Sequence, residues 1–202
     1  SMPPENRPGG KFIDFEEVPS FRGSSFLPKL IDHIRNKEVI RIYYQPFYED
    51  KPYFITVHPY LLKEYRYRWY LIGLNDLKNE LRTYALDRIW DISPVEVAFI
   101  PQKFNSKEYF AHAVGVISPT GPPPEVELQV TRHQAQYLIT QPLHKSQTVI
   151  GEDEDHVLFR YKVHPTYEFR QLILAMGAEA VVLQPDRFRK EMIRELEKTL
   201  TC

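Results

Sequence analysis

The stretch YRYRWYLIGL, residues 65–74, is the clearest strand signal in the chain. Aromatic and β-branched residues favour strands, and the side chains of a strand alternate between two faces. One expected face is apolar and carries Tyr65, Tyr67, Trp69 and Leu71. The other expected face carries Arg66, Arg68 and Tyr70. The pattern predicts a core strand with an anion-binding surface. A half-buried strand with solvated arginines fits the same residues.

Four further strand signals surround this one. With the central strand placed at 67–74, the others are expected at 39–45, 53–62, 81–86 and 90–97. Pro59 lies inside the second strand, where proline indicates a bulge or a sheet edge. Five short antiparallel strands predict a small closed β-barrel, because closure removes exposed edges. Leu27, Leu30, Ile31 and Ile34 have the spacing of a short amphipathic helix that covers one end.

Two segments rich in Pro, Gly and Ser divide the chain. Residues 1–35 are expected to form a linker arm followed by the short helix, and 36–101 the barrel. Residues 102–123 are expected to be a linker that ends in the proline-rich run 118–124. Within it, 104–114 fits either a helix or an irregular crossover. Ser1-Met2 resembles a tag remnant joined to an internal start, so further residues are expected upstream.

Residues 124–202 follow a different pattern. Alternating and helical periodicities predict the order β-α-β-β-α-β and a final helix after Pro185. This order is the split βαβ arrangement. The predicted fold class is therefore mixed β and α+β, with a five-stranded barrel followed by a ferredoxin-like domain.

Composition excludes several classes of protein. The 202 residues carry 26 basic and 27 acidic side chains, so no global field favours nucleic acid or membranes. Residues 36–101 also balance, with nine of each sign, so a broad duplex-binding surface is not expected. No apolar run approaches the roughly 20 residues of a membrane span. With Cys202 as the single cysteine, no disulfide or cysteine-based metal site is predicted, and a cytoplasmic location is expected. The seven histidines are scattered, so no metal site is predicted, and no cofactor is predicted either.

Cationic and aromatic side chains recur on neighbouring predicted strands. Arg82 and Tyr84 share a face, followed by Asp87-Arg88, while His58 shares a face with Thr56 and Tyr60. Adjacent strands lie about 4.8 Å apart, so parts of these sets can converge on one surface. Such a surface suits phosphates and stacked bases. Arg88 could equally pair with Asp87 or brace a turn. His58, Tyr44 and Tyr60 could equally be packing residues.

Three motifs in order resemble the core of the WYL domain. They are HPYLL at 58–62, RWYLIG at 68–73 and RTYALDRI at 82–89. The region 124–202 loosely resembles the WCX extension that commonly follows this domain. The resemblance implies a small Sm-like or SH3-like barrel in a bacterial transcriptional regulator, with a winged helix-turn-helix ahead of it. Residues 1–25 cannot supply that helix-turn-helix, so operator DNA would be bound only through a missing upstream domain.

The resemblance also implies which residues hold a ligand. Arg68, Tyr70, Arg82 and Arg88 match motif positions to which the family assigns a nucleotide or nucleic-acid fragment, and His58 matches a position that varies. With the residues that the strand pattern adds, the predicted ligand-binding set is Arg68, Tyr70, Arg82, Arg88, His58, Arg66 and Tyr44.

Two functions remain open from sequence. The first is a ligand-sensing and dimerising region of a transcriptional regulator that binds a nucleotide or short single-stranded nucleic acid. The second is a purely structural homodimerisation module. An enzyme is not predicted, since no nucleophile or metal set stands out.

Overall fold

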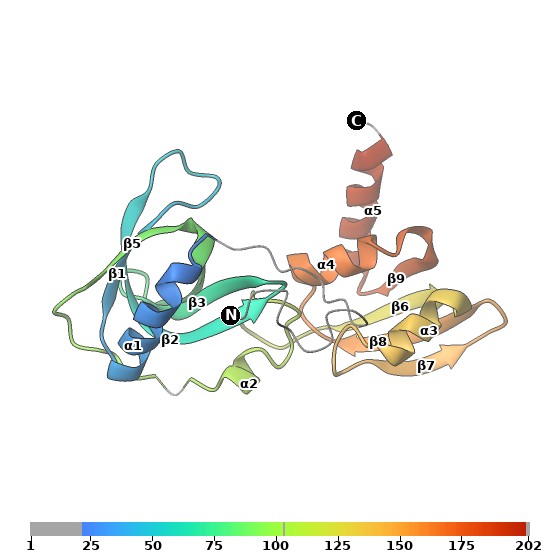
Figure 1. Ribbon diagram of the computed structural model, residues 1–202. Helices are drawn as coiled ribbons and strands as arrows, with labels where there is room; N and C mark the ends of the chain where they lie inside the picture. Colours follow the sequence, from blue (N-terminus) through green and yellow to red (C-terminus); the bar gives the residue numbers. More distant parts are fainter. Residues whose placement is uncertain (1–21, 103, 201–202) are drawn as a thin grey trace, which may run out of the picture. The chain divides into compact units, whose positions relative to one another are not determined.

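The computed structural model describes residues 22–102 and 104–200. Most of the proline-rich arm predicted for the N-terminus lies outside these residues. The chain divides into two compact units, residues 1–100 and 101–202. Each unit contains one antiparallel sheet, with five strands in the first and four in the second. The structure is therefore mixed α and β, as predicted (Figure 1).

In the described part of the first unit, helix α1 and two 3-10 turns accompany a sheet in the order β4-β3-β2-β1-β5. All five strands predicted from the sequence are present, and their ends differ from the prediction by at most three residues. The elements are η2 (Ser24–Phe26), α1 (Leu27–Asn36), β1 (Ile40–Tyr44), β2 (Tyr53–Tyr65), β3 (Arg68–Asn75), β4 (Glu80–Ala85), η3 (Leu86–Arg88) and β5 (Ile89–Pro94). The register between β2 and β3 shifts at Pro59, which confirms the predicted bulge.

The stretch 65–74 is not one strand. β2 ends at Tyr65, β3 begins at Arg68, and these two residues pair across a hairpin. Arg66 and Tyr67 form the turn with φ of 48° and 65°. Two-residue turns with positive φ usually contain Asn or Gly, and neither is present here. The single strand expected from residue 65 onward is therefore wrong, and Arg66 does not share a strand face with Arg68.

The sheet of the first unit is not a closed barrel. Among the described residues β4 and β5 are its two edges. The three-residue turn η3 leads the chain from β4 to the far side of the sheet, where Ile92 of β5 pairs with Ile42 of β1. The expected closure is wrong because β5 takes β1 as its partner and does not pair with β4.

Alternate residues of the strands form one core under α1. Leu71 of β3 faces Leu62 of β2 on one side and Tyr84 of β4 on the other. Leu30 of α1 packs on this face and is fully buried. A side chain at Gly73 could not be accommodated, because a Cβ there would lie 2.5 Å from a methyl group of Val57. The RWYLIG stretch thus packs tightly between its neighbours.

The second unit has the element order predicted from the sequence. Its elements are α2 (Ser106–Tyr109), β6 (Glu125–Thr131), α3 (Arg132–Thr140), β7 (Thr148–Glu152), β8 (His156–Lys162), α4 (Tyr167–Leu174), η4 (Gly177–Glu179), β9 (Ala180–Gln184) and α5 (Asp186–Leu200). The sheet order is β7-β8-β6-β9. Helices α3, α4 and α5 contribute Leu138, Phe169 and Phe188 to one core with the sheet. Val114, before β6, belongs to the same core.

β7 is an edge strand with exposed apolar residues. Val149 and Ile150 are 52% and 37% exposed. The register between β7 and β8 shifts between Val149 and Gly151, so the strand carries an irregularity at its middle.

Two histidines connect distant parts of the second unit. Burial lowers the pKa of His144 and of His164, and the nearby charge of Lys145 acts in the same direction on His144. His144 contacts the backbone of Ala111, and His164 contacts that of Gly121. These backbone contacts favour the protonated rings, and burial outweighs them, so both pKa values stay below the ordinary histidine value.

We expect acidification to destabilise the second unit. A histidine pKa that is lower in the folded state than in the unfolded state stabilises the fold above the ordinary value of 6.5, and this stability is lost as the pH falls below it. Thermal unfolding measured between about pH 7.5 and pH 5 should show a falling Tm. The double variant His144→Gln, His164→Gln should reduce this slope, and His133→Gln, an exposed histidine of the same unit, should not. An unchanged slope in the double variant would refute the assignment.

Candidate functional site

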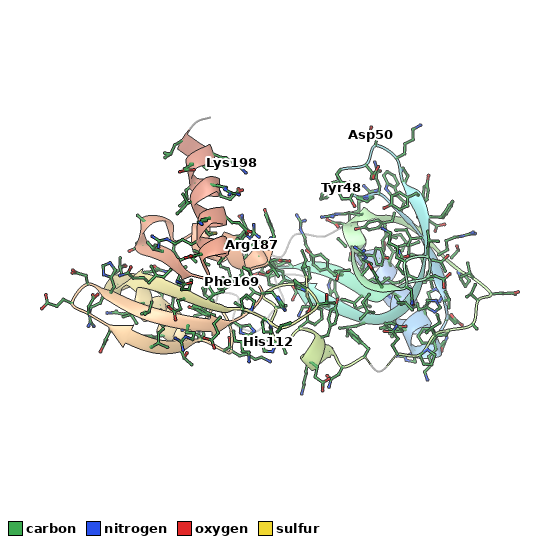
Figure 2. All side chains as sticks on the ribbon, turned by 180° about the vertical axis from the view of Figure 1, so that it is seen from behind. Tyr48, Asp50, His112, Phe169, Arg187 and Lys198 are labelled. Carbon is green, nitrogen blue, oxygen red and sulfur yellow. The ribbon has the colours of Figure 1, made fainter. Side chains whose placement is uncertain are left out.

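A pocket of about 580 Å³ opens at one end of the sheet in the first unit. It lies where the start of β2 extends past β3, between the loop that joins β1 to β2 and the loop that joins β3 to β4. Figure 2 labels Tyr48 and Asp50 in the first of these loops. The lining residues are Tyr44, Pro46, Tyr48, Tyr53, Phe54, Ile55, Thr56, Asn75, Asp76, Leu77, Lys78, Arg82, Thr83, Tyr84 and Arg88.

Three of the predicted ligand-binding residues lie together in this pocket: Tyr44, Arg82 and Arg88. Arg82 and Arg88 come from β4 and the adjoining η3, whereas Tyr44 comes from β1, about 40 residues earlier. Strand pairing joins them: Tyr44 pairs with Tyr53, while Arg82 lies two residues before Tyr84 on the core face of β4. The pocket therefore continues the core face of the sheet towards solvent.

Arg88 is the most enclosed cation of the pocket. Its side chain is 27% exposed. Its guanidinium carbon lies 4.0 Å from the centre of the Phe47 ring, a cation–π contact. Its Nε is buried and has no hydrogen-bond partner among the described residues, and it lies 3.9 Å from Asp87 Oδ1. The Nε–H of Arg88 can therefore still donate a hydrogen bond.

Arg82 is more accessible. Its side chain is 48% exposed and pairs with the exposed carboxylate of Glu80. An exposed ion pair contributes little stability, so an incoming anion can replace Glu80 at low cost. Lys78 adds a third cation from the loop between β3 and β4.

Tyrosine rings form the pocket floor. The Tyr44 and Tyr84 rings meet edge to face with centres 5.4 Å apart. Burial raises the pKa of Tyr84 to about 12 and also raises that of Tyr44, although the charge of Arg88 opposes the rise at Tyr44. Both phenols are therefore neutral hydrogen-bond donors near neutral pH. Tyr84 Oη accepts a 2.9 Å bond from Asn75 Nδ2, and both residues are buried.

The other predicted residues lie outside the pocket lining. Arg68 is half exposed and lies 3.7 Å from Asp87 Oδ2, so Asp87 stands between Arg68 and Arg88. Tyr70 is on β3, two residues beyond Arg68. Arg66 is in the hairpin turn, with its guanidinium 5.6 Å from the centre of the Tyr65 ring. His58 is fully buried and hydrogen-bonded through both ring nitrogens.

Sequence reasoning missed several lining residues. Tyr48, Lys78 and Asp76 lie in loops, where no periodicity indicates which way a side chain points. Tyr53 could have been identified from its pairing with Tyr44, but only with the strand register known. Tyr84 was recognised as sharing a face with Arg82 and not as part of the site.

The chemistry of the pocket suits an anion that carries a flat ring. Its lining combines three cations with a single carboxylate, Asp76, while the whole chain has a net charge of −1. Guanidinium groups form charge-assisted bonds with phosphate, and aromatic faces stack on bases. In the described part of the chain no three His, Cys, Asp or Glu side chains gather as metal ligands would, and no helix is long and apolar enough to cross a membrane.

Comparisons with known proteins match both units. The family model of the WYL domain matches residues 25–94, and that of the WCX domain matches residues 122–200. Protein PafB of Mycobacterium leprae (strain TN) is 26% identical over 184 residues, which are 89% of this chain and 54% of PafB. The chain therefore spans about half the length of this curated relative.

Two solved structures are similar. Proteasome accessory factor B/C of Arthrobacter aurescens matches 88% of this chain and 27% of its own, at 16% identity and a TM-score of 0.41. A CRISPR Cas-related protein matches 86% of this chain and 50% of its own, at 14% identity and a TM-score of 0.57. The second likeness is one of fold alone.

We expect Tyr84→Phe to destabilise the first unit by about 1–2 kcal/mol, because Asn75 would keep a buried donor without an acceptor. Urea unfolding monitored by tryptophan fluorescence measures this change. Tyr53→Phe alters an accessible ring of the same pocket and should cost less than about 0.5 kcal/mol. Equal effects of the two substitutions would contradict the role given to the Asn75–Tyr84 bond.

Proposed function

Because this chain belongs to the proteins that combine a WYL domain with a WCX domain, we propose that it is the ligand-sensing region of a transcriptional regulator. The ligand is a nucleotide or a short single-stranded nucleic acid. The observation that carries the proposal is the pocket in which Arg82 and Arg88 meet the rings of Tyr44 and Tyr84.

Charge and shape both support this ligand class. A charge-assisted hydrogen bond from a guanidinium to phosphate is worth about 1.5–3 kcal/mol, so two arginines can retain one phosphate group against water. The ring of the lining residue Tyr48, 82% accessible, offers a face for a base. A pocket of about 580 Å³ is within the usual size of small-molecule sites and admits no duplex.

The regulatory role rests on the family and on the relative PafB. Operator binding in the whole protein is part of the same proposal and is assigned to a helix-turn-helix domain. The second unit supports a ferredoxin-like assignment, since β8 lies between β6 and β7 and every neighbouring pair of strands is antiparallel.

Replacing Arg82 or Arg88 by alanine should weaken binding at least tenfold, because each substitution removes one charge-assisted contact of about 1.5–3 kcal/mol. Fluorescence anisotropy with a labelled short single-stranded DNA, and calorimetry with ATP and GTP, would measure the affinities. Wild-type protein that binds none of these probes would refute the proposal.

Two further variants make this test specific. Arg35→Ala removes a solvated arginine of α1, 73% exposed and outside the pocket, and should leave the affinity unchanged. Arg68→Ala examines a residue that the sequence predicts and that lies outside the pocket. A loss of affinity there would extend the site across Asp87 to the Arg68 side.

The second candidate function, homodimerisation, is favoured by α5. Ile193, Leu196 and Leu200 recur at i, i+3 and i+7 and are 44%, 48% and 86% exposed. The buried Phe188 and Met192 lie on the adjoining face of α5 and pack into the core of the second unit. Figure 1 shows the C-terminal end of α5 standing away from that sheet. We propose that a second copy of this chain covers the exposed stripe.

If the stripe mediates assembly, the double variant Ile193→Glu, Leu196→Glu should convert dimers to monomers, because dimerisation would bury two carboxylates in an apolar contact. Sedimentation velocity gives the oligomeric state. Ile139→Glu on α3, where the isoleucine is 58% exposed, serves as the control. A wild-type monomer at high protein concentration would exclude this candidate.

A further inference from the structure

The first unit holds its own last residues by an unusual double contact. The backbone N–H of Ile100 donates to His58 Nδ1 at 3.1 Å, and Tyr60 Oη donates to the carbonyl oxygen of Ile100 at 2.7 Å. The ring of Phe99 meets His58 and Tyr60 edge to face, with centres 5.8 Å and 5.6 Å apart. Two side chains of β2 thus bind one exposed residue through both of its backbone polar groups.

His58 also contacts the pocket. Its Nε2 lies 3.0 Å from Asp76 Oδ1, and the ring is fully buried. Because Nδ1 accepts from Ile100, the proton of the neutral ring lies on Nε2 and is donated to Asp76. Asp76 belongs to the pocket lining, and its backbone N–H donates to the carbonyl of Thr56 at 3.0 Å. One buried ring therefore connects a pocket residue with the end of the unit.

We propose that ligand in the pocket and the docked segment Phe99–Ile100 stabilise each other through His58. This inference rests on the proposed function, since it concerns regulation of the same pocket. The coupling element is the imidazole, which keeps its lone pair towards Ile100 only while Asp76 accepts from the opposite nitrogen.

The coupling is positive because ligand and segment each order groups that the other contacts. A ligand that contacts Lys78 and Arg82 fixes the loop between β3 and β4, and Asp76 lies in that loop. A fixed Asp76 holds the His58 ring in the orientation that Ile100 requires. With ligand bound, the segment docks on a His58 ring that is already ordered. With the segment docked, the ligand binds a loop that is already ordered. Each event therefore favours the other, which is positive cooperativity. Linkage requires both effects to have the same magnitude.

The coupled segment, Phe99–Ile100, lies at the junction of the two units in the sequence. Ile100 is the last residue of the first unit, and Pro101 begins the second. Between Pro94, where β5 ends, and Phe99, the described residues show backbone bonds from Val95 to Val39 and from Val97 to Val95. Ligand binding in the pocket therefore stabilises the docked position of Phe99–Ile100, the segment that leads into the second unit.

Tyr60→Phe tests the coupling away from the pocket. It removes one bond to Ile100 and alters no lining residue. We expect it to weaken binding of the labelled single-stranded DNA about fivefold or more. In wild-type protein, saturation with the same probe should slow hydrogen exchange of the Ile100 amide, measured by NMR, because bound ligand favours the docked segment. Tyr137→Phe, an exposed tyrosine of the second unit, should change neither quantity.

A double-mutant cycle with Asp76→Asn shows whether the effect passes through His58. The Tyr60→Phe effect on affinity should shrink when Asp76 is already replaced. Wild-type binding with unchanged affinity in Tyr60→Phe would overturn the coupling and leave the proposed function standing. Wild-type protein that binds no probe would overturn both. If Tyr60→Phe does not fold, Phe99→Leu takes its place, with the same expected loss and the same refuting result.

Discussion

The pairing of β3 with β2 and β4 is the constraint on which the first unit depends. Side chains alternate with a period of two, so a slip of one residue would expose Leu71 and turn charged residues into the core. The tight approach of Gly73 to Val57 helps to hold this register. The same register places Arg82 and Tyr84 on the face that continues into the pocket. Core packing and site geometry therefore arise from one set of strand pairs.

The element order could be predicted because both halves carry strong periodic patterns. The hairpin turn at Arg66-Tyr67 could not, since an arginine and a tyrosine in the left-handed region carry no turn signal. The barrel was wrongly expected because the order of strands in the chain does not reveal that β5 pairs with β1. Long-range pairing is decided by packing, and local sequence contains little information about it.

The site was only partly accessible to sequence reasoning for a similar reason. Arg68 and Arg82 have similar sequence contexts, yet Arg82 lines the pocket and Arg68 pairs with Asp87. Each arginine has an acidic neighbour, and the exposure of these pairs determines their strength. Arg82 and Glu80 are both about half exposed, so this pair can open without a large loss. The more enclosed Asp87 lies near both Arg68 and Arg88, and no motif could indicate this arrangement.

The irregular β7 strand has a consequence for the behaviour of the protein at high concentration. A straight outer strand with exposed valine and isoleucine would be a template on which another polypeptide could add by backbone pairing. The register shift between Val149 and Gly151 interrupts the even spacing of donors and acceptors that such an addition needs. The register shift therefore disfavours fibrillar polymerisation through this edge of the second unit.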